Sequence, residues 1–84
     1  MDMIIGAGLR GASDGKTRPV INPATGEVID TVPEATLEDV AYAIGVAVEA
    51  QRDWAARTTR ERADMIRAAA GMIRARRLEL GKVL

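Results

Sequence analysis

The chain has 84 residues, which limits it to one small domain. Apolar residues make up 48% of it, but one Trp, one Tyr and no Phe supply little bulk for a core. A compact fold that is stable by itself is therefore not favoured. The sequence contains no cysteine and no histidine, which excludes a disulfide framework, a thiolate nucleophile, an imidazole base and metal sites built on these side chains.

Twelve basic and twelve acidic residues cancel, but they divide unevenly along the chain. Residues 1–51 hold three basic and eight acidic residues, a net charge of −5, whereas residues 52–84 hold nine and four, a net charge of +5. A basic half of this kind is typical of a solvated helix face, or of one that faces acidic surface in a larger protein. Because few aromatic side chains are present to stack on bases, we predict no nucleic-acid partner.

The beginning of the chain is not typical of a signal peptide. It opens with Met1-Asp2, and the apolar run Met3–Leu9 is short and interrupted by glycines. No segment approaches the roughly 20 apolar residues of a membrane span. We therefore expect a cytoplasmic protein with no membrane partner.

The expected fold class is α+β, and its first part, residues 1–33, is predicted to be extended. Residues 1–18 predict a strand at Met3–Ile5 and then a loop with a turn at Asp14-Gly15. Residues 19–33 predict a β-hairpin whose four-residue loop is Pro23–Gly26, because Pro fixes φ and Gly permits positive φ. Pro33 is expected to end the second strand.

Residues 36–80 predict a pair of amphipathic helices that meet around Ala55–Thr59. Thr36 is a suitable N-cap with Asp39 three residues later, and Thr58 with Glu61 forms a capping-box pattern. Apolar residues then recur at helical spacing, at Leu37, Val40, Ala41, Ile44, Ala47, Val48 and Trp54, and at Met65, Ile66, Ala69, Ala70, Ile73 and Leu80. Such stripes need a surface to bury them, and the domain of residues 1–84 is therefore predicted to be partial.

Two glycine-rich patterns near the start match nucleotide-binding motifs only superficially. Residues 6–11 fit G-x-G-x-x-G, and residues 11–17 nearly fit a phosphate loop. Both motifs require a helix directly after the glycines, to hold the phosphates at its N-terminus. Turn and loop formers follow instead, so we reject both interpretations.

The remaining candidates for chemistry have simpler structural interpretations. Ser13 is the only serine and has no nearby base in the sequence, while Glu38 and Asp39 are explained by the helix start. Trp54, at the end of an apolar stripe, is interpreted as a core or interface residue. We therefore predict no catalytic, cofactor-binding or metal-binding residue in this chain.

An ordered set of motifs nevertheless resembles the opening of the aldehyde dehydrogenase superfamily. The set begins with Asn22-Pro23-Ala24-Thr25-Gly26-Glu27, followed by Val32-Pro33, and that family opens with an NPATGE hairpin followed by VP. The family's next helix has the pattern A-I-x-x-A-x-x-A-F-x-x-W, and here Ala43, Ile44, Ala47, Ala50 and Trp54 fit, with Gln51 in place of Phe. The family's Ser/Thr cap, E-R-A run and apolar stripe match Thr58, Glu61-Arg62-Ala63, Ile66, Ala70 and Ile73. The resemblance extends from about Gly15 to Leu80 and favours the succinate-semialdehyde or betaine-aldehyde branch.

The resemblance implies an NAD(P)-dependent oxidation of an aldehyde to a carboxylic acid in full-length members. Their nucleophilic Cys, general-base Glu, oxyanion Asn and nucleotide pocket all lie downstream of the matched segment. In some members the backbone before the NP pair helps to hold a monovalent cation, which maps to Val20 and Ile21, but a further ligand is missing here. The matched segment would thus be scaffold of the cofactor-binding domain. Residues 78–82 depart from the longer pattern of the family, as if the resemblance ended abruptly there.

Three hypotheses follow from the sequence. The first is an N-terminal fragment of an NAD(P)-dependent aldehyde dehydrogenase that binds no cofactor alone, is inactive, and has the remainder of that fold as its partner. The second is a small module without catalysis that docks or self-associates through its Val40/Ile44/Val48 and Ile66/Ile73 stripes. The third and weakest is a nucleic-acid-binding arginine-rich helix.

Overall fold

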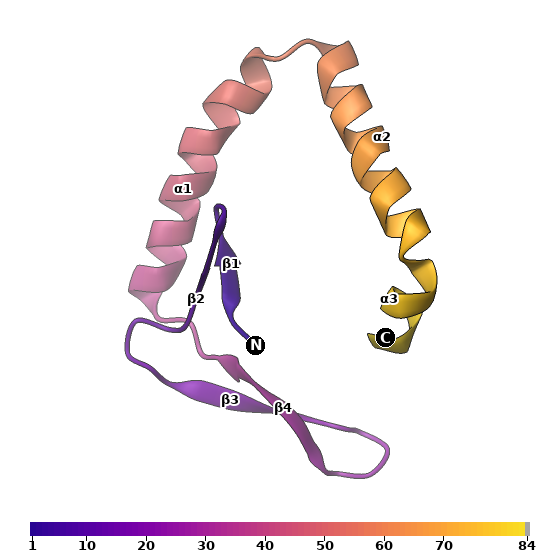
Figure 1. Ribbon diagram of the computed structural model, residues 1–84. Helices are drawn as coiled ribbons and strands as arrows, with labels where there is room; N and C mark the ends of the chain where they lie inside the picture. Colours follow the sequence, from indigo (N-terminus) through magenta and orange to yellow (C-terminus); the bar gives the residue numbers. More distant parts are fainter. Residues whose placement is uncertain (84) are drawn as a thin grey trace. The chain divides into compact units, whose positions relative to one another are not determined.

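A computed structural model describes residues 1–83, as short strands followed by helices (Figure 1). The α+β class expected from the sequence is confirmed. The chain divides into two compact units, Met1–Gln51 and Arg52–Leu84. This boundary falls where the net charge changes sign, so the first unit is acidic and the second is basic.

The chain begins with a hairpin of β1 (Met3–Ile5) and β2 (Gly8–Arg10), where the sequence predicted one strand and a loop. Gly6 has φ +61° and the next residue has a negative φ, which is the requirement of a type II′ turn. A Cβ at Gly6 would lie 3.1 Å from Val46 Cγ1, so the loop also sits close against the helix that contains Val46. Glycine is therefore needed here for both the turn and the close approach.

The second hairpin pairs β3 (Thr17–Ile21) with β4 (Val28–Pro33), so the expected hairpin is present and its first strand begins at Thr17. Asn22 organises its loop, because the Asn22 backbone bonds to Glu27 O and Gly26 N, and its side-chain Oδ1 accepts from Ala24 N. Gly26 has φ +77°, as the expected turn requires. Pro33 is the last residue of the strand rather than the residue after it.

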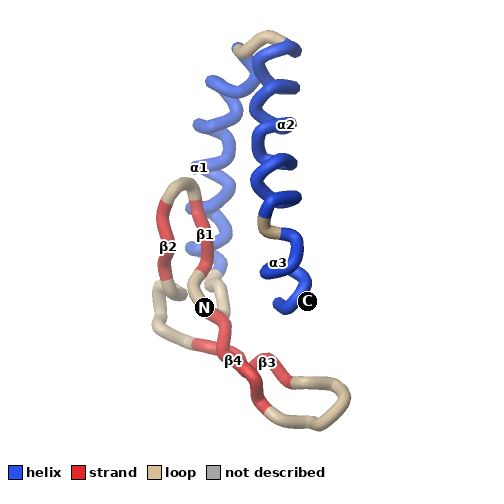
Figure 2. Tube along the Cα trace, turned by 45° about the vertical axis from the view of Figure 1, so that its right-hand side comes forward, coloured by secondary structure: helices blue, strands red, loops and turns tan. Residues whose placement is uncertain are grey.

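Helix α1 (Leu37–Ala56) packs against the first hairpin with a different face from the one predicted. Asp39, Ala43 and Val46, spaced three to four residues apart, are the buried and half-buried positions on its first turns. Figures 1 and 2 show the β1–β2 hairpin beside this part of α1. The predicted stripe is left uncovered: Val40 is 48%, Ile44 59% and Val48 55% exposed.

Helix α2 (Thr59–Ala75) begins with the predicted capping box and is followed by a third helix that the sequence did not predict. Thr58 Oγ1 accepts from Glu61 N, and Glu61 Oε2 accepts from Thr58 N, both at 3.1 Å. The interruption lies at Arg76, and α3 (Arg77–Val83) then continues to the end of the described residues. The predicted helix pair of residues 36–80 is therefore three helices over residues 37–83.

The described part of the chain, residues 1–83, buries no apolar side chain. Ile66 is 60% and Ile73 is 61% exposed, so the second predicted stripe is also uncovered. Gly45 and Gly71 lie inside α1 and α2, and a Cβ added at either would have nothing within 4 Å. The described residues therefore do not provide a surface that covers either predicted stripe.

Candidate functional site

The most organised polar site in the described residues is centred on Asp39, whose side chain is 1% exposed. It lies in the first turn of α1, where the backbone N–H groups have no helical partner. Thr36 Oγ1 accepts from Asp39 N at 3.1 Å, and Asp39 Oδ2 accepts from Thr36 N at 3.0 Å. This is a reciprocal capping box in which aspartate takes the place of the usual Glu or Gln.

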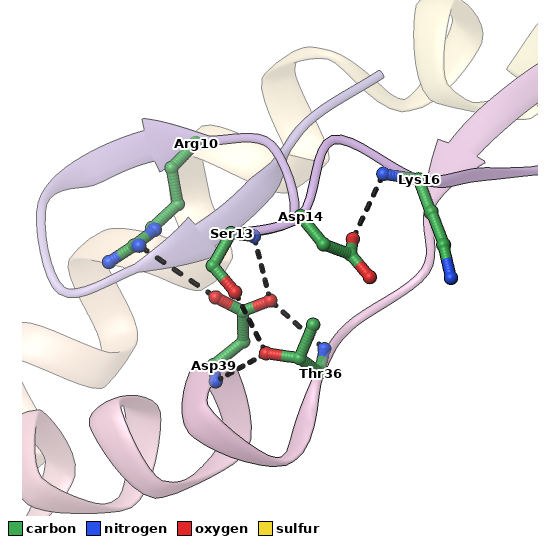
Figure 3. Close-up of polar contacts among 6 residues, drawn as sticks. All are labelled: Arg10, Ser13, Asp14, Lys16, Thr36 and Asp39. Carbon is green, nitrogen blue, oxygen red and sulfur yellow. Dashed lines mark hydrogen bonds and ion pairs between the residues drawn. The ribbon is translucent and has the colours of Figure 1, made fainter.

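The same carboxylate also binds the segment that leads from the first hairpin to the second (Figure 3). Asp39 Oδ2 accepts a second hydrogen bond from Ser13 N at 3.0 Å, and the Ser13 and Thr36 hydroxyls lie 2.9 Å apart. Ser13 is held in position by a turn in which Gly15 N donates to Ala12 O. One side chain therefore joins parts of the chain that are 26 residues apart.

Arg10, the last residue of β2, completes this Asp39 cluster, which we define as Arg10, Ser13, Thr36 and Asp39. Its Nη2 lies 3.7 Å from Asp39 Oδ1, and its guanidinium carbon lies 4.7 Å from the centre of the Tyr42 ring. Hydrogen bonds from the Thr36 and Ser13 backbones, against a smaller opposing effect of burial, hold the pKa of Asp39 below its ordinary value. The cluster is thus built to keep a carboxylate ionised.

The chemistry of this cluster is that of a structural clasp. The Ser13 hydroxyl is hydrogen-bonded to the Thr36 hydroxyl, and the Ser13 backbone N–H donates to Asp39 Oδ2. The adjoining surface depression, lined by Ser13, Asp14, Thr36, Leu37 and Glu38, is open to solvent. The contacts of the cluster thus join Arg10 and Ser13 to the start of α1.

The ionised state of Asp39 makes the clasp sensitive to acid. A carboxyl whose pKa is lower in the folded state contributes stability above its unfolded pKa, and this contribution is lost as pH falls through the folded pKa. We expect the Ser13 and Thr36 amides to lose protection together, at a pH below the ordinary pKa of an aspartate. An NMR titration that follows the Asp39 carboxyl carbon and these amides tests this, and a midpoint at or above the ordinary aspartate value would contradict it.

In the second unit, the best-defined feature is a groove between the last turn of α1 and the start of α2. It is lined by Trp54, Thr59, Arg62, Ala63 and Ile66. Trp54 and Arg62 are half-buried, and Arg62 Nε has no hydrogen-bond partner. Arg57 lies between α1 and α2, where its guanidinium donates to Asp53 Oδ2 at 3.2 Å and to Met65 Sδ at 3.6 Å. Trp54 is thus half-buried beside this groove, and its role as a core or interface residue stays a prediction.

Neither glycine-rich pattern leads directly into a helix. Residues 6–11 form the turn and second strand of the first hairpin, and the next helix begins only at Leu37. Within residues 1–83, three or more acidic side chains are nowhere grouped as metal ligands would be. The helices described between residues 37 and 83 are also too short or too polar to cross a bilayer.

Comparison with known families identifies the protein family. The family model described as "Aldehyde dehydrogenase family" matches residues 10–84, which is most of the chain. The chain belongs to the aldehyde dehydrogenase family. No solved structure matches it. The Asp39 cluster lies inside the matched range, so it is part of the aldehyde dehydrogenase segment rather than of an added element.

Sequence reasoning found half of this cluster in advance. Thr36 and Asp39 were predicted from their cap spacing, which is a local signal. Arg10 and Ser13 were missed as partners, because their contact with Asp39 depends on how the hairpin folds back on α1. The available signal was the unexplained polarity of Ser13-Asp14 between two extended segments.

Proposed function

We propose that this chain is the opening scaffold segment of the cofactor-binding domain of an NAD(P)-dependent aldehyde dehydrogenase, and that it has no activity by itself. The observation that carries the proposal is a family match over residues 10–84 combined with a described structure that buries no apolar side chain. Helices with one apolar stripe gain most of their stability from packing against another surface. The partner that such a segment requires is the remainder of the dehydrogenase fold.

The exposed area supports this role. The accessible surface is 7158 Å², whereas a folded 9.0 kDa monomer exposes about 4,900 Å². The excess of roughly 2,300 Å² is larger than the share of about 800 Å² that one partner buries in a standard interface. The open space beside Gly45 and Gly71 supports the same proposal, because glycine in a helix interior costs about 1 kcal/mol without a packing reason.

The chemistry of the family also supports inactivity in isolation. An aldehyde dehydrogenase acts through a cysteine thiolate, and this sequence has no cysteine. NAD or NADP, and an aldehyde of the succinate-semialdehyde or betaine-aldehyde class, belong to the proposed full-length enzyme. A cytoplasmic location is part of the proposal.

When the purified chain is incubated with NAD or NADP and a panel of aldehydes, the absorbance of the reduced cofactor should not rise. A full-length member of the family, assayed in parallel, serves as the positive control. Turnover by this chain alone that survives repurification would overturn the proposal.

An alternative is a small interaction module without catalysis. The observation that favours it is the exposure of the Val40/Ile44/Val48 stripe and of the Ile66/Ile73 stripe. A sharp, cooperative melt of a defined oligomer supports the module, whereas a broad melt of a loosely helical chain supports the scaffold segment. Circular dichroism with sedimentation distinguishes the two.

A further inference from the structure

Arg62, near the start of α2, is a half-buried arginine that forms no ion pair within the described residues. We propose that, in the full-length dehydrogenase, an acidic side chain from the remainder of the fold enters the groove beside Trp54 and pairs with the Arg62 guanidinium. This inference rests on the proposed scaffold role and deepens it, because it gives the chemistry of the segment that covers this groove.

The Arg62 side chain contains a donor that neither water nor the described protein satisfies. Arg62 Nε is withdrawn from solvent and has no hydrogen-bond partner. Buried donors in folded proteins nearly always have an acceptor, because an unpaired one has lost its bonds to water without replacement. The side chain as a whole is only half-buried, so a group that enters the groove can still reach the guanidinium.

The second unit does not provide the missing acceptor from its own acidic residues. It holds nine basic and four acidic residues. Each of the four carboxylates already accepts a hydrogen bond from another group, and these residues are Asp53, Glu61, Asp64 and Glu79. Two of them lie within two positions of Arg62, yet their partners are Thr58 N and Arg67. The unit therefore has an excess of positive charge at this groove.

The rest of the groove is suited to an apolar side chain. Its volume is about 300 Å³, at the lower end of the range of ligand pockets. It is lined by Trp54, Thr59, Arg62, Ala63 and Ile66. Three of these five residues are apolar, and Trp54 offers a large surface for contact. The covering segment is therefore expected to place an apolar side chain next to its acid.

A carboxylate fits Arg62 better than a neutral acceptor does. A guanidinium presents parallel N–H donors that match the two oxygens of a carboxylate. A backbone carbonyl supplies one oxygen and no charge, so covering the groove with it would leave a buried cation without a counter-charge. In a protein segment the matching groups are the side chains of aspartate and glutamate.

Two blocked peptides test this pairing on the purified full chain. They are acetyl-Val-Glu-Val-amide and acetyl-Val-Gln-Val-amide, which differ in charge but hardly in shape. Trp54 is the only tryptophan, so its emission reports occupancy of the groove. We expect saturable binding that is about tenfold tighter for the glutamate peptide, because hydrogen bonds between charged groups are the stronger class. In NMR spectra, the Arg62 Nε–H resonance should move to lower field with this peptide only.

Three variants assign the preference to Arg62. Arg62→Gln should remove the preference for the acidic peptide, and Arg62→Lys should keep part of it, since lysine retains the charge without the planar fork. Arg60→Gln is the matched control, because Arg60 is an exposed arginine on the same helix that does not line the groove. It should leave the preference unchanged. Circular dichroism checks that each variant keeps its helices.

Several results would overturn the pairing. Equal affinity for the two peptides, or no saturable change with either, would show that the groove does not select a carboxylate. Equal losses in Arg62→Gln and Arg60→Gln would show general attraction to a basic unit. An Arg62 Nε–H that is already hydrogen-bonded in the free chain would show that the acceptor is internal. Aldehyde turnover by the chain would instead reject the scaffold role, and that assay does not depend on this groove.

Discussion

Replacing Asp39 with alanine is expected to release residues 10–16 from α1. The Asp39 carboxylate accepts from Ser13 N and Thr36 N and lies 3.7 Å from the Arg10 guanidinium, so the substitution removes every bond that crosses the cluster through this side chain. Amide exchange at Ser13 and Thr36 should accelerate about tenfold or more, because hydrogen bonds to a charged acceptor are the stronger class. Hydrogen exchange followed by NMR measures both amides.

Two further variants separate the charge of Asp39 from its shape. Asp39→Asn keeps one acceptor oxygen but loses the ion pair with Arg10, and we expect an intermediate acceleration. Glu38→Gln removes the neighbouring carboxylate, which is on the same helix turn but outside the cluster, and should leave exchange at Ser13 unchanged. Equal effects of Asp39→Asn and Glu38→Gln would show that general attraction to the helix N-terminus, and not the clasp, holds the segment.

The parts of this fold that were predictable are those fixed by local chemistry. The loop of residues 23–26 requires Pro and Gly at set positions, and the caps at Thr36 and Thr58 need a polar side chain with an acid three residues later. Each of these features is decided within six residues, and each was found. The helical spacing of both apolar stripes is likewise a local signal. Both stripes are exposed, and from the sequence we expected that this chain does not supply the surface that would cover them.

The elements that the sequence did not predict depend on contacts between distant residues or on weak local propensity. The strand Gly8–Arg10 is three residues long and includes a glycine, so its propensity is low and only pairing with Met3–Ile5 reveals it. The third helix depends on Arg76, which pairs with Glu79 through two hydrogen bonds of 3.0 and 2.6 Å just after α2 is interrupted. The face of α1 that contacts the hairpin contains Asp39, which a hydrophobic pattern assigns to solvent.

The α2 cap should control helix content more strongly here than in an ordinary globular protein. Helix α2 has 17 residues, only a little more than the length of about 15 below which isolated helices are marginal in water, and helices in proteins gain most of their stability from tertiary packing. The second unit's Ile66 and Ile73 are mostly exposed, so packing contributes little to α2. Local terms such as the Thr58 cap therefore decide whether the helix forms.

Replacing Thr58 with alanine should cost about 1 kcal/mol and lower the folded-to-frayed ratio of α2 roughly fivefold. The Thr58 Oγ1 acceptor of Glu61 N is lost, whereas the backbone N–H of residue 58 can still donate to Glu61 Oε2. Carbon chemical shifts across residues 59–75 report the loss residue by residue, strongest in the first turns. Thr59→Ala is the matched control, because it removes the same atoms one position later and substitutes a better helix former. If the two variants changed α2 equally, the capping box would not be what starts this helix, and packing that the exposed stripes do not show would have to explain its stability.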